Sequence, residues 1–397
     1  MAGEWQETTW GDLATLEYGK ALRDYQDTPS TARVFGTNGP IGWHDKALWH
    51  GPGVIVGRKG AYRGVQYTED PYWVIDTAYS LQPKTSINLR WAYYQLKSID
   101  LNNVDDGSPI PSTTRPAFYA LPVLKPPRAT QDRIADLLSS LDDKIELNRR
   151  MAETLEAMAR ALFRSWFVDF DPVQAKAEGR PTGLPDDLAV LFPDRFGDDG
   201  SPSGWATRNL IDDFRVVMGQ SPPGSTYNED GTGVPFYQGK TDFGFRFPTR
   251  RVFCTAPTRI AHRGDTLLSV RAPVGDINMA DEECCLGRGV AALRHNSGSS
   301  SFTYYAAQVL QPAISSFNDD GTVFGAINRK QLEKISFINP GLLIVNAFHK
   351  FAEPLDERIS LHMRQVSALA TLRDVLLPKL ISGELRIADA ENRISAA

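Results

Sequence analysis

The chain has 397 residues, of which 43 are Lys or Arg and 48 are Asp or Glu, so its formal net charge is -5. This length suggests two or three domains, and ordinary contents of hydrophobic (42%) and charged (23%) residues argue against wholesale disorder. The acidic balance argues against a histone-like protein that coats nucleic acid by bulk charge, but it is compatible with a DNA-binding protein that has a local basic surface.

The cysteines and the lengths of the apolar runs favour a reducing, cytoplasmic location. Cys254, Cys284 and Cys285 form no CxxC pair, and the six histidines form no HxxxH pattern. We therefore expect no metal site and no disulfide framework. The first residues do not resemble a signal peptide, and no apolar run approaches 18 residues, so the sequence predicts a cytoplasmic protein in a reducing environment.

A long internal repeat organises the chain. Trp5 recurs as Trp205, 200 residues later, and the LDDKI run at 141–145 recurs as LDERI at 355–359, 214 residues later. Further matches keep the same order, so a duplication is expected. We predict five segments: a first β-rich domain (1–127), a helix (128–167), an acidic connector (168–202), a second β-rich domain (203–340), and a second helix with a tail (341–397).

Each β-rich domain contains short apolar runs bounded by Gly and Pro, which are typical of strands and turns. In the first domain, residues 53–57 (GVIVG) predict a strand, and a loop rich in Arg, Lys and Gly follows at 58–64. In the second domain, residues 264–268 (GDTLL) predict the matching strand, which Arg271 follows.

Each predicted helix carries apolar residues at alternating spacings of three and four, the pattern of a coiled coil. The first helix begins after Pro126 and Pro127, which cannot lie inside it. Its predicted seam residues are Ile134, Leu138, Leu141, Ile145, Asn148, Leu155 and Leu162. Those of the second helix are Leu355, Ile359, His362, Val366, Leu369 and Leu376.

Each seam needs a partner, and the chain supplies one in its own repeat. A pseudo-twofold relation between the halves would pair the two helices antiparallel. Asn148 and His362 occupy matching slots near the middle of the seams, where they would fix the register if buried. The alternative is that both face solvent. The fold class expected is therefore α+β, with two β-rich domains separated by two long antiparallel coiled-coil helices.

The stretch between the halves looks like a linker. Residues 168–200 contain eight acidic and three basic residues, and Pro and Gly recur through it. This composition predicts an exposed acidic connector that contributes nothing to a core.

The sequence carries no recognisable catalytic motif. It lacks a nucleophile elbow, a phosphate-binding loop, a dinucleotide-binding glycine motif and an HExxH zinc motif. The acidic pairs Asp105-Asp106 and Asp319-Asp320 precede glycine, so turns are favoured over metal sites.

Three motifs resemble the specificity (S) subunits of type I restriction-modification systems. They are residues 131–145 of the first helix, residues 162–170 (LFRSWFVDF) at its end, and residues 376–385 (LLPKLISGEL) near the C-terminus. Residues 219–223 (GQSPP) and 264–271 are similar to the target-recognition domains of that family. The second helix departs from the first in lacking a counterpart of Gln131.

The resemblance implies a non-catalytic DNA reader. Each recognition domain would bind one half of a split asymmetric target on double-stranded DNA, while the coiled coil sets the spacer between the halves. Two methylation (M) subunits would dock on the helices, and restriction (R) subunits would join the assembly. S-adenosylmethionine, ATP and Mg would bind those partners, so that this chain holds no cofactor.

The residues that read DNA are predicted from loops in which Arg, Lys, Asn, Gln and aromatics lie near Gly, since such side chains suit base edges and phosphates. The candidates are Arg58, Lys59, Tyr62, Arg63, Arg115, Tyr227, Asn228, Gln238, Lys240, Arg246, Arg250, Arg251, Arg271 and Arg329. For each of them the alternative is an ordinary solvated surface side chain. The alternative for the whole protein is a coiled-coil adaptor whose β-rich heads bind protein or glycan.

Overall fold

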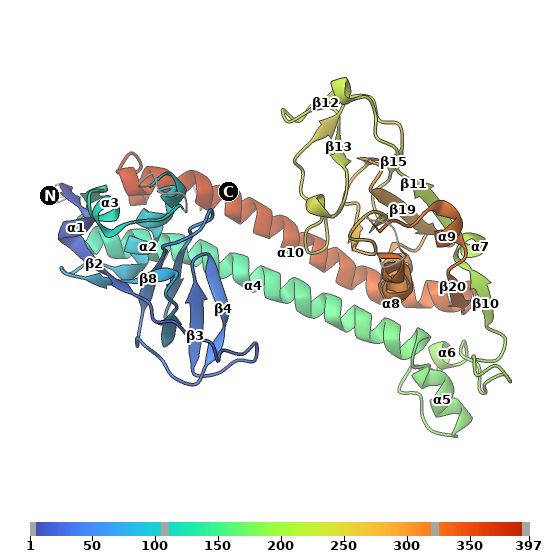
Figure 1. The fold of residues 1–397 in the computed structure, drawn as a ribbon. Coiled ribbons are helices and arrows are strands. Elements are labelled where there is room, and N and C mark those ends of the chain that lie inside the picture. The colour runs from blue at the N-terminus through green and yellow to red at the C-terminus, as the bar shows by residue number, and fades with distance from the viewer. Residues whose placement is uncertain (1–4, 105–110, 319–324, 391–397) are drawn as a thin grey trace. The chain divides into compact units, whose positions relative to one another are not determined.

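The structure, a computed structural model, describes residues 5–104, 111–318 and 325–390. The chain divides into two units, Met1–Asn148 with Gln365–Ala397, and Arg149–Arg364 (Figure 1). Each unit holds one β-rich domain and one part of each of two long helices, α4 (Arg128–Phe167) and α10 (Leu342–Ser382). The bounds of α4 coincide with those predicted for the first helix.

The first unit is built on a four-stranded antiparallel sheet. Its strand order is β2 (Ala14–Tyr18), β8 (Ala78–Pro83), β5 (Gly53–Gly57) and β6 (Val65–Thr68). The GVIVG run of β5 is buried at every residue because both faces of the strand are covered. Val54 and Val56 belong to the main core of the unit, whereas Ile55 faces a smaller cluster with Phe35 and Tyr72.

A second sheet and a ribbon complete the first domain. The sheet has the order β4 (Gly39–His44), β3 (Ala32–Gly36) and β7 (Tyr72–Val74), with β3 and β7 parallel. The ribbon pairs β1 (Gln6–Thr9) with β9 (Pro122–Lys125). The short helices are α1 (Trp10–Leu13), α2 (Leu89–Lys97), α3 (Arg115–Tyr119) and the 3-10 turn η1 (Leu101–Asn103).

The second unit repeats this plan. Its four-stranded sheet has the order β11 (Phe214–Met218), β19 (Val290–His295), β16 (Thr266–Ser269) and β17 (Ile277–Met279). Its second sheet has the order β12 (Tyr227–Asn228), β14 (Phe253–Cys254), β13 (Val234–Tyr237), β18 (Cys284–Leu286) and β15 (Ile260–Ala261). Its ribbon pairs β10 (Ala206–Asn209) with β20 (Ser336–Asn339).

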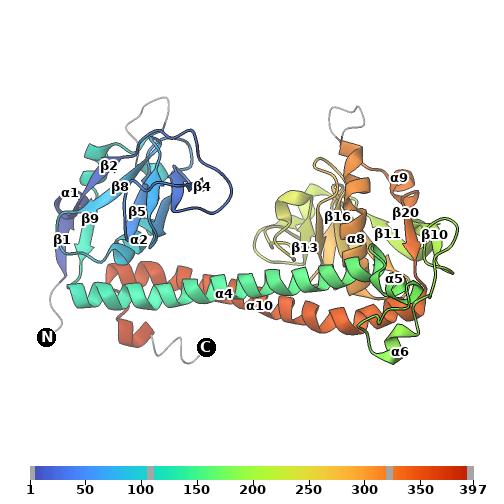
Figure 2. The same cartoon turned by 90° about the horizontal axis from the view of Figure 1, so that it is seen from below.

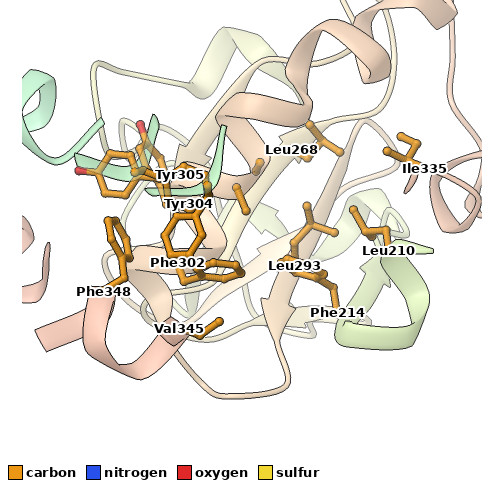
Figure 3. Close-up of a cluster of buried hydrophobic side chains, with 14 of the residues drawn as sticks. Leu210, Phe214, Leu268, Leu293, Phe302, Tyr304, Tyr305, Ile335, Val345 and Phe348 are labelled. Carbon is orange, nitrogen blue, oxygen red and sulfur yellow. The ribbon is translucent and has the colours of Figure 1, made fainter. Parts of the chain in front are cut away.

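The remaining helices of the second unit are short except for one. They are α5 (Asp171–Ala177), α6 (Asp186–Ala189), α7 (Leu210–Asp213), α8 (Ser300–Ser315), α9 (Arg329–Glu333), and the 3-10 turns η2 (Gly224–Thr226), η3 (Lys240–Asp242) and η4 (Ser316–Asn318). Helix α8 packs on the sheet at β17 and β19. Its Phe302 ring also lies 5.5 Å from that of Phe163 on α4 and 6.5 Å from that of Phe348 on α10, so α8 connects the sheet to the long helices. Figure 2 shows α8 beside the long helices, and Figure 3 shows Phe302 near Phe348.

The predicted duplication is confirmed by topology. The sheet β2-β8-β5-β6 has the same order as β11-β19-β16-β17, and the parallel pair β3-β7 corresponds to β13-β18. Both short helices after the first ribbon strand begin with a capping box, Thr9 with Asp12 and Asn209 with Asp212. This reciprocal bonding satisfies the free backbone N–H groups of a helix start, which fixes where each chain turns toward its sheet.

The two long helices run antiparallel within each unit. In the first unit, Leu138 near the start of α4 shares a core with Leu380 near the end of α10. In the second unit, Phe163 near the end of α4 shares a core with Phe348 near the start of α10.

All of the predicted seam residues are buried or half-buried. Those that are buried are Ile134, Leu138, Leu141, Ile145, Asn148, Ile359, Val366 and Leu376, and those that are half-buried are Leu155, Leu162, Leu355, His362 and Leu369. Asn148 is 0% exposed, which rules out the alternative that it faces solvent. Whether Asn148 fixes the register stays a prediction.

The prediction of an exposed connector is wrong for part of its length. Val173 on α5 is 0% exposed, Leu188 on α6 is 6% exposed and Phe192 is 2% exposed, and all three belong to the core of the second unit. The acidic residues of this stretch dominate its composition, but its few apolar residues fold inward against Trp166 and its neighbours. The predicted turns at Asp105-Asp106 and Asp319-Asp320 lie outside the described residues.

Candidate nucleic-acid interface

A basic cleft lies on the domain of the second unit. It has a volume of about 550 Å³. Its lining residues are Ser221, Gln238, Gly239, Lys240, Thr241, Arg271, Ala272, Pro273, Arg288 and Gly289. It brings together three of the candidate residues, Gln238, Lys240 and Arg271, from segments more than 30 residues apart.

Arg271 is placed by backbone pairing just beyond the end of β16. Its backbone forms an isolated bridge with Ala326, and its side chain is exposed. Lys240 begins η3 and also lines the cleft, with its ammonium 3.0 Å from a carboxylate oxygen of Asp276. Both side chains are more than one-third exposed, so they can meet a polyanion without losing a buried contact.

Arg288 is a cleft residue that sequence reasoning missed. It stands between Gly287 and Gly289, and a Cβ at Gly289 would collide with the carbonyl oxygen of Gln238. The glycines therefore let the chain pass close to Gln238 while the exposed Arg288 side chain joins the cleft. The available signal was the Gly-Arg-Gly run itself, which resembles the Gly-flanked basic loop at 58–64.

A different basic site occurs on the domain of the first unit. The guanidinium carbons of Arg58 and Arg115 lie 4.7 Å and 4.1 Å from the centroid of the Tyr18 ring. Tyr18 is 47% exposed and rests on Tyr79, with ring centroids 5.1 Å apart. The two candidate arginines thus converge on one aromatic ring, which the sequence had not indicated because Tyr18 ends a strand rather than lying in a loop.

The pKa of the Tyr79 hydroxyl is raised to about 12 by burial and by the neighbouring Tyr18. Tyr79 therefore stays neutral at physiological pH, as does any unperturbed tyrosine. The Tyr79 hydroxyl consequently does not offset the positive charge of Arg58 and Arg115. The Arg58 guanidinium also donates a hydrogen bond to the backbone carbonyl of Asp76, at 3.0 Å, which fixes its direction.

Lys59 and Arg271 occupy equivalent places in the repeat. The backbone bridge between Lys59 and Ser112 recurs as the bridge between Arg271 and Ala326. Both basic side chains are exposed, and so is Tyr62, at 76%. The duplication therefore places a cation at the same point of each domain.

Arg63 does not belong to the surface. It is 4% exposed, and its guanidinium donates to the backbone carbonyls of Gly60, Leu101 and Asn102 at 2.9–3.1 Å. These bonds tie the basic loop to η1, so we correct its predicted role from DNA contact to support of the loop.

Arg246 also requires correction. It is 0% exposed, and its guanidinium contacts the carboxylates of Glu156 on α4 and Asp356 on α10. Sequence reasoning took this arginine for a loop residue at the surface, because burial between a domain and two helices is a tertiary property.

Tyr227 and Asn228 make local contacts that explain their presence. The Tyr227 hydroxyl donates to the carbonyl of Pro222 at 2.7 Å, and its ring packs on Phe236. The Asn228 amide closes a turn by donating to the carbonyl of Thr232 and accepting from its N–H. Both side chains are half-buried, and their contact with DNA stays a prediction.

Three further candidates are exposed but form ion pairs. Arg250 lies beside Glu282, Arg251 lies 3.1 Å from Asp242, and Arg329 lies beside Glu333. None of these three lines the basic cleft. They stay predicted DNA contacts. To bind a DNA phosphate, each arginine would have to leave its carboxylate partner.

The described residues supply little for chemistry. Cys254, Cys284 and Cys285 are all buried, and burial raises the pKa of the Cys285 thiol to about 11, so it is not an activated nucleophile. Within the described ranges no group of three or more His, Cys, Asp or Glu side chains is arranged to hold a metal ion. Among the same residues, no helix is both long and apolar enough to span a membrane.

Comparison with known proteins gives a consistent set of relatives. A family model for the type I restriction modification DNA specificity domain matches residues 2–157 and 202–368. The chain is 30% identical over 268 residues to a putative type I restriction enzyme MjaX specificity subunit from Methanocaldococcus jannaschii, a match that covers 66% of this chain and 59% of that protein. It is 27% identical over 337 residues to the type I restriction enzyme HindI specificity subunit from Haemophilus influenzae, covering 69% of this chain and 71% of that protein.

The fold is shared with a solved S subunit. The crystal structure of a type I restriction-modification system S subunit from M. genitalium aligns with a TM-score of 0.63 and 20% identity, over 95% of this chain and 96% of that one. The two matches of the family model fall one on each repeat, so the duplication seen in the topology is also a duplication of that domain.

Proposed function

The chain belongs to the type I restriction-modification DNA specificity family, and on that premise we propose that it is the DNA-reading subunit of such a complex. Each of its two recognition domains reads one half of a split, asymmetric target. The observation that carries the proposal is the recurrence of an exposed cation, Lys59 and Arg271, at the same place in both domains.

The two basic sites differ in chemistry, which supports an asymmetric target. The first domain presents two arginines around an exposed tyrosine ring, whereas the second presents a cleft with Arg271, Arg288 and Gln238. Arginine and glutamine can bond bidentately to guanine and adenine in the major groove, and lysine suits phosphate. Two domains with different side chains in equivalent places would therefore select different half-sites.

The long helices would set the spacer between the two half-sites. Both α4 and α10 contribute residues to each unit, and each is one continuous helix. A rigid connection of fixed length is what a reader needs if its half-sites lie a set distance apart. Changing the length of the helices should therefore change the spacer in the target.

Methylation subunits, two of them, would dock on the helical parts of the chain, and restriction subunits would join that assembly. S-adenosylmethionine, ATP and Mg would bind to those partners and none of them to this chain, which would act without catalysis of its own. Its place of work would be the cytoplasm. Because the net charge is -5, the isolated chain should bind DNA weakly and depend on its partners to neutralise phosphates.

The proposal is tested by binding to pooled random duplexes, with and without the cognate methylation subunits. The expected result is enrichment of one motif made of two short half-sites and a fixed unspecified spacer. If no motif is enriched with the partners present, the alternative function is favoured, namely a coiled-coil adaptor whose β-rich heads bind protein or glycan. Metal-dependent cleavage of DNA by the purified chain alone would contradict its non-catalytic role.

A further inference from the structure

The second recognition domain sends one arginine into the place where it meets the long helices. The guanidinium Nη2 of Arg246 lies 2.5 Å from Asp356 Oδ1 on α10, and Nη1 lies 3.4 Å from Glu156 Oε2 on α4. Its carbon atom Cζ stands 3.5 Å from the centroid of the Tyr304 ring on α8. One side chain of the domain therefore contacts three helices.

The charges around Arg246 are matched and removed from water. The Glu156 side chain is 4% exposed and that of Asp356 is 13% exposed, and Arg160 neutralises Glu156 from the outer side at 2.7 Å. Burial alone would lower the pKa of the Arg246 guanidinium, but Tyr304, Asp356, Tyr305 and Glu156 together raise it. Arg246 is therefore charged in the folded protein, and its position is dictated by two fixed carboxylates.

The repeat shows that this contact is particular to the second domain. In the first unit, Asp142 on α4 is the residue equivalent to Asp356. Asp142 forms its ion pair with Arg373, which belongs to the other long helix, α10, and not to the recognition domain. The residue of α4 equivalent to Arg373 is Ala159, which is 0% exposed. In the second unit the long helices therefore have no arginine at this position, and Arg246 of the recognition domain pairs with Asp356 instead.

The same loop links this contact to the basic cleft. Gln238 and Lys240 line the cleft, and Arg246 follows six residues after Lys240. Between them the loop is held by Asn278, whose amide donates to the carbonyl of Gly244 at 2.8 Å, and by Met279, whose N–H donates to the carbonyl of Arg246 at 3.0 Å. Arg246 is therefore connected to the cleft residues Gln238 and Lys240 through a loop that these two bonds hold in place.

We infer that Arg246 is a positioning residue, which fixes the second recognition domain on the helix pair and so sets how accurately the second half-site is read. This inference rests on the proposed function. A buried charged group that bridges several elements specifies one geometry better than it stabilises the fold, because its attraction is largely offset by the desolvation of the charges. Removal of the whole charged set should therefore affect accuracy more than stability.

The test uses the complete complex with its methylation subunits and compares methylation of pooled random duplexes. Arg246→Met alone removes a cation from the buried Glu156, which keeps Arg160, and from the half-buried Asp356, so the informative variant combines Arg246→Met with Glu156→Gln and Asp356→Asn. We expect this triple variant to melt close to the wild type, to lose about tenfold in discrimination at the second half-site, and to keep the first. The single change Glu156→Gln, which removes the negative charge from one of the two helix contacts, should give a smaller loss at the same half-site.

The matched control is Arg208→Met, which removes an exposed arginine of the same unit whose Nε lies 3.2 Å from Asp213. It should leave both half-sites unchanged. Wild-type discrimination at both half-sites in the triple variant and in Glu156→Gln, or an equal loss at both, would overturn the inference. If the wild-type complex itself selects no split motif, the proposed function fails instead, so the two failures are distinguishable.

Discussion

The hydroxyl of Tyr94 on α2 donates a hydrogen bond to the carboxylate of Asp142 on α4, with 2.7 Å between the two oxygens. The second repeat contains the same pair, since the hydroxyl of Tyr305 on α8 donates to Asp356 on α10 at 3.0 Å. In each unit, therefore, the helix that covers the sheet is joined to a long helix by a tyrosine and an aspartate. This contact is part of what holds a recognition domain on the helix pair.

Tyr94→Phe should destabilise the first unit. The change removes a partly buried hydrogen bond to a charged group, a contact whose loss costs about 1.5–3 kcal/mol. Chemical denaturation monitored by circular dichroism measures the effect. Tyr93→Phe is the control, because the Tyr93 hydroxyl only accepts a bond from the exposed Lys97. Equal stability of the two variants would show that the Tyr94 bond contributes nothing.

Leu141→Asp should disrupt the helix pair. Leu141 is 5% exposed in a core that includes Leu376 and Leu380, and an unpaired carboxylate there loses its hydration as well as the apolar contacts. We expect a loss of at least about 3 kcal/mol in unfolding free energy. Leu147→Asp, on the same helix but 49% exposed, should cost far less. Unchanged stability and target spacing in Leu141→Asp would reject the seam.

Arg58→Ala and Arg271→Ala should weaken sequence discrimination at different half-sites of the target. Each removes an arginine from one domain only, so each should weaken discrimination at one half-site, by about 1–3 kcal/mol where the arginine contacts a base. Binding of the complex to duplexes with single substitutions in either half measures this. A uniform weakening of both halves would show that the arginine meets phosphate rather than a base.

The stability of the second unit should decline at mildly acidic pH because of His295. Burial between Phe214 and Phe302 lowers the pKa of the His295 imidazole, which Asp213 opposes only in part. The unfolded chain takes up a proton on His295 near pH 6.5 while the folded chain resists it, so this stabilisation is present above about pH 6.5 and is lost as the pH falls below it. Urea unfolding at pH 7.5 and 5.5 should show a smaller pH effect in His295→Gln than in the wild type.

The control for this prediction is His50→Gln, which changes an exposed histidine and should keep the pH effect of the wild type. An equal pH effect in the wild type and in His295→Gln would mean that His295 is not held neutral by the fold.

The helices and the duplication could be predicted because they depend on local chemistry and periodicity. Pro126 and Pro127 define the start of α4, and the spacing of Leu138, Leu141 and Ile145 defines its buried face. The topology of the sheets could not be predicted, since short strands such as β12 and β15 have only two residues each and pair with segments far along the chain. The connector was mispredicted because Val173 and Phe192 are too few to alter its acidic composition.

The candidate interface was predictable only in part. Lys59 and Arg271 follow recognisable strands, so their exposure could be anticipated from the pattern. Arg63 and Arg246 have the same residue type in similar loops, yet both are buried by partners that the sequence does not identify, namely backbone carbonyls in one case and two helical carboxylates in the other. Tyr18 was missed because it ends a strand and joins its site only through folding, whereas Arg288 was missed although its Gly-Arg-Gly run was a visible signal.

The most direct test of the proposed role is a map of methylated adenines in DNA from cells that express this chain with its methylation subunits, compared with cells that lack this chain alone. The account predicts one asymmetric motif, split into two short halves by a spacer of constant length, that disappears when the chain is absent. A contiguous motif, or methylation that is unchanged without the chain, would contradict it.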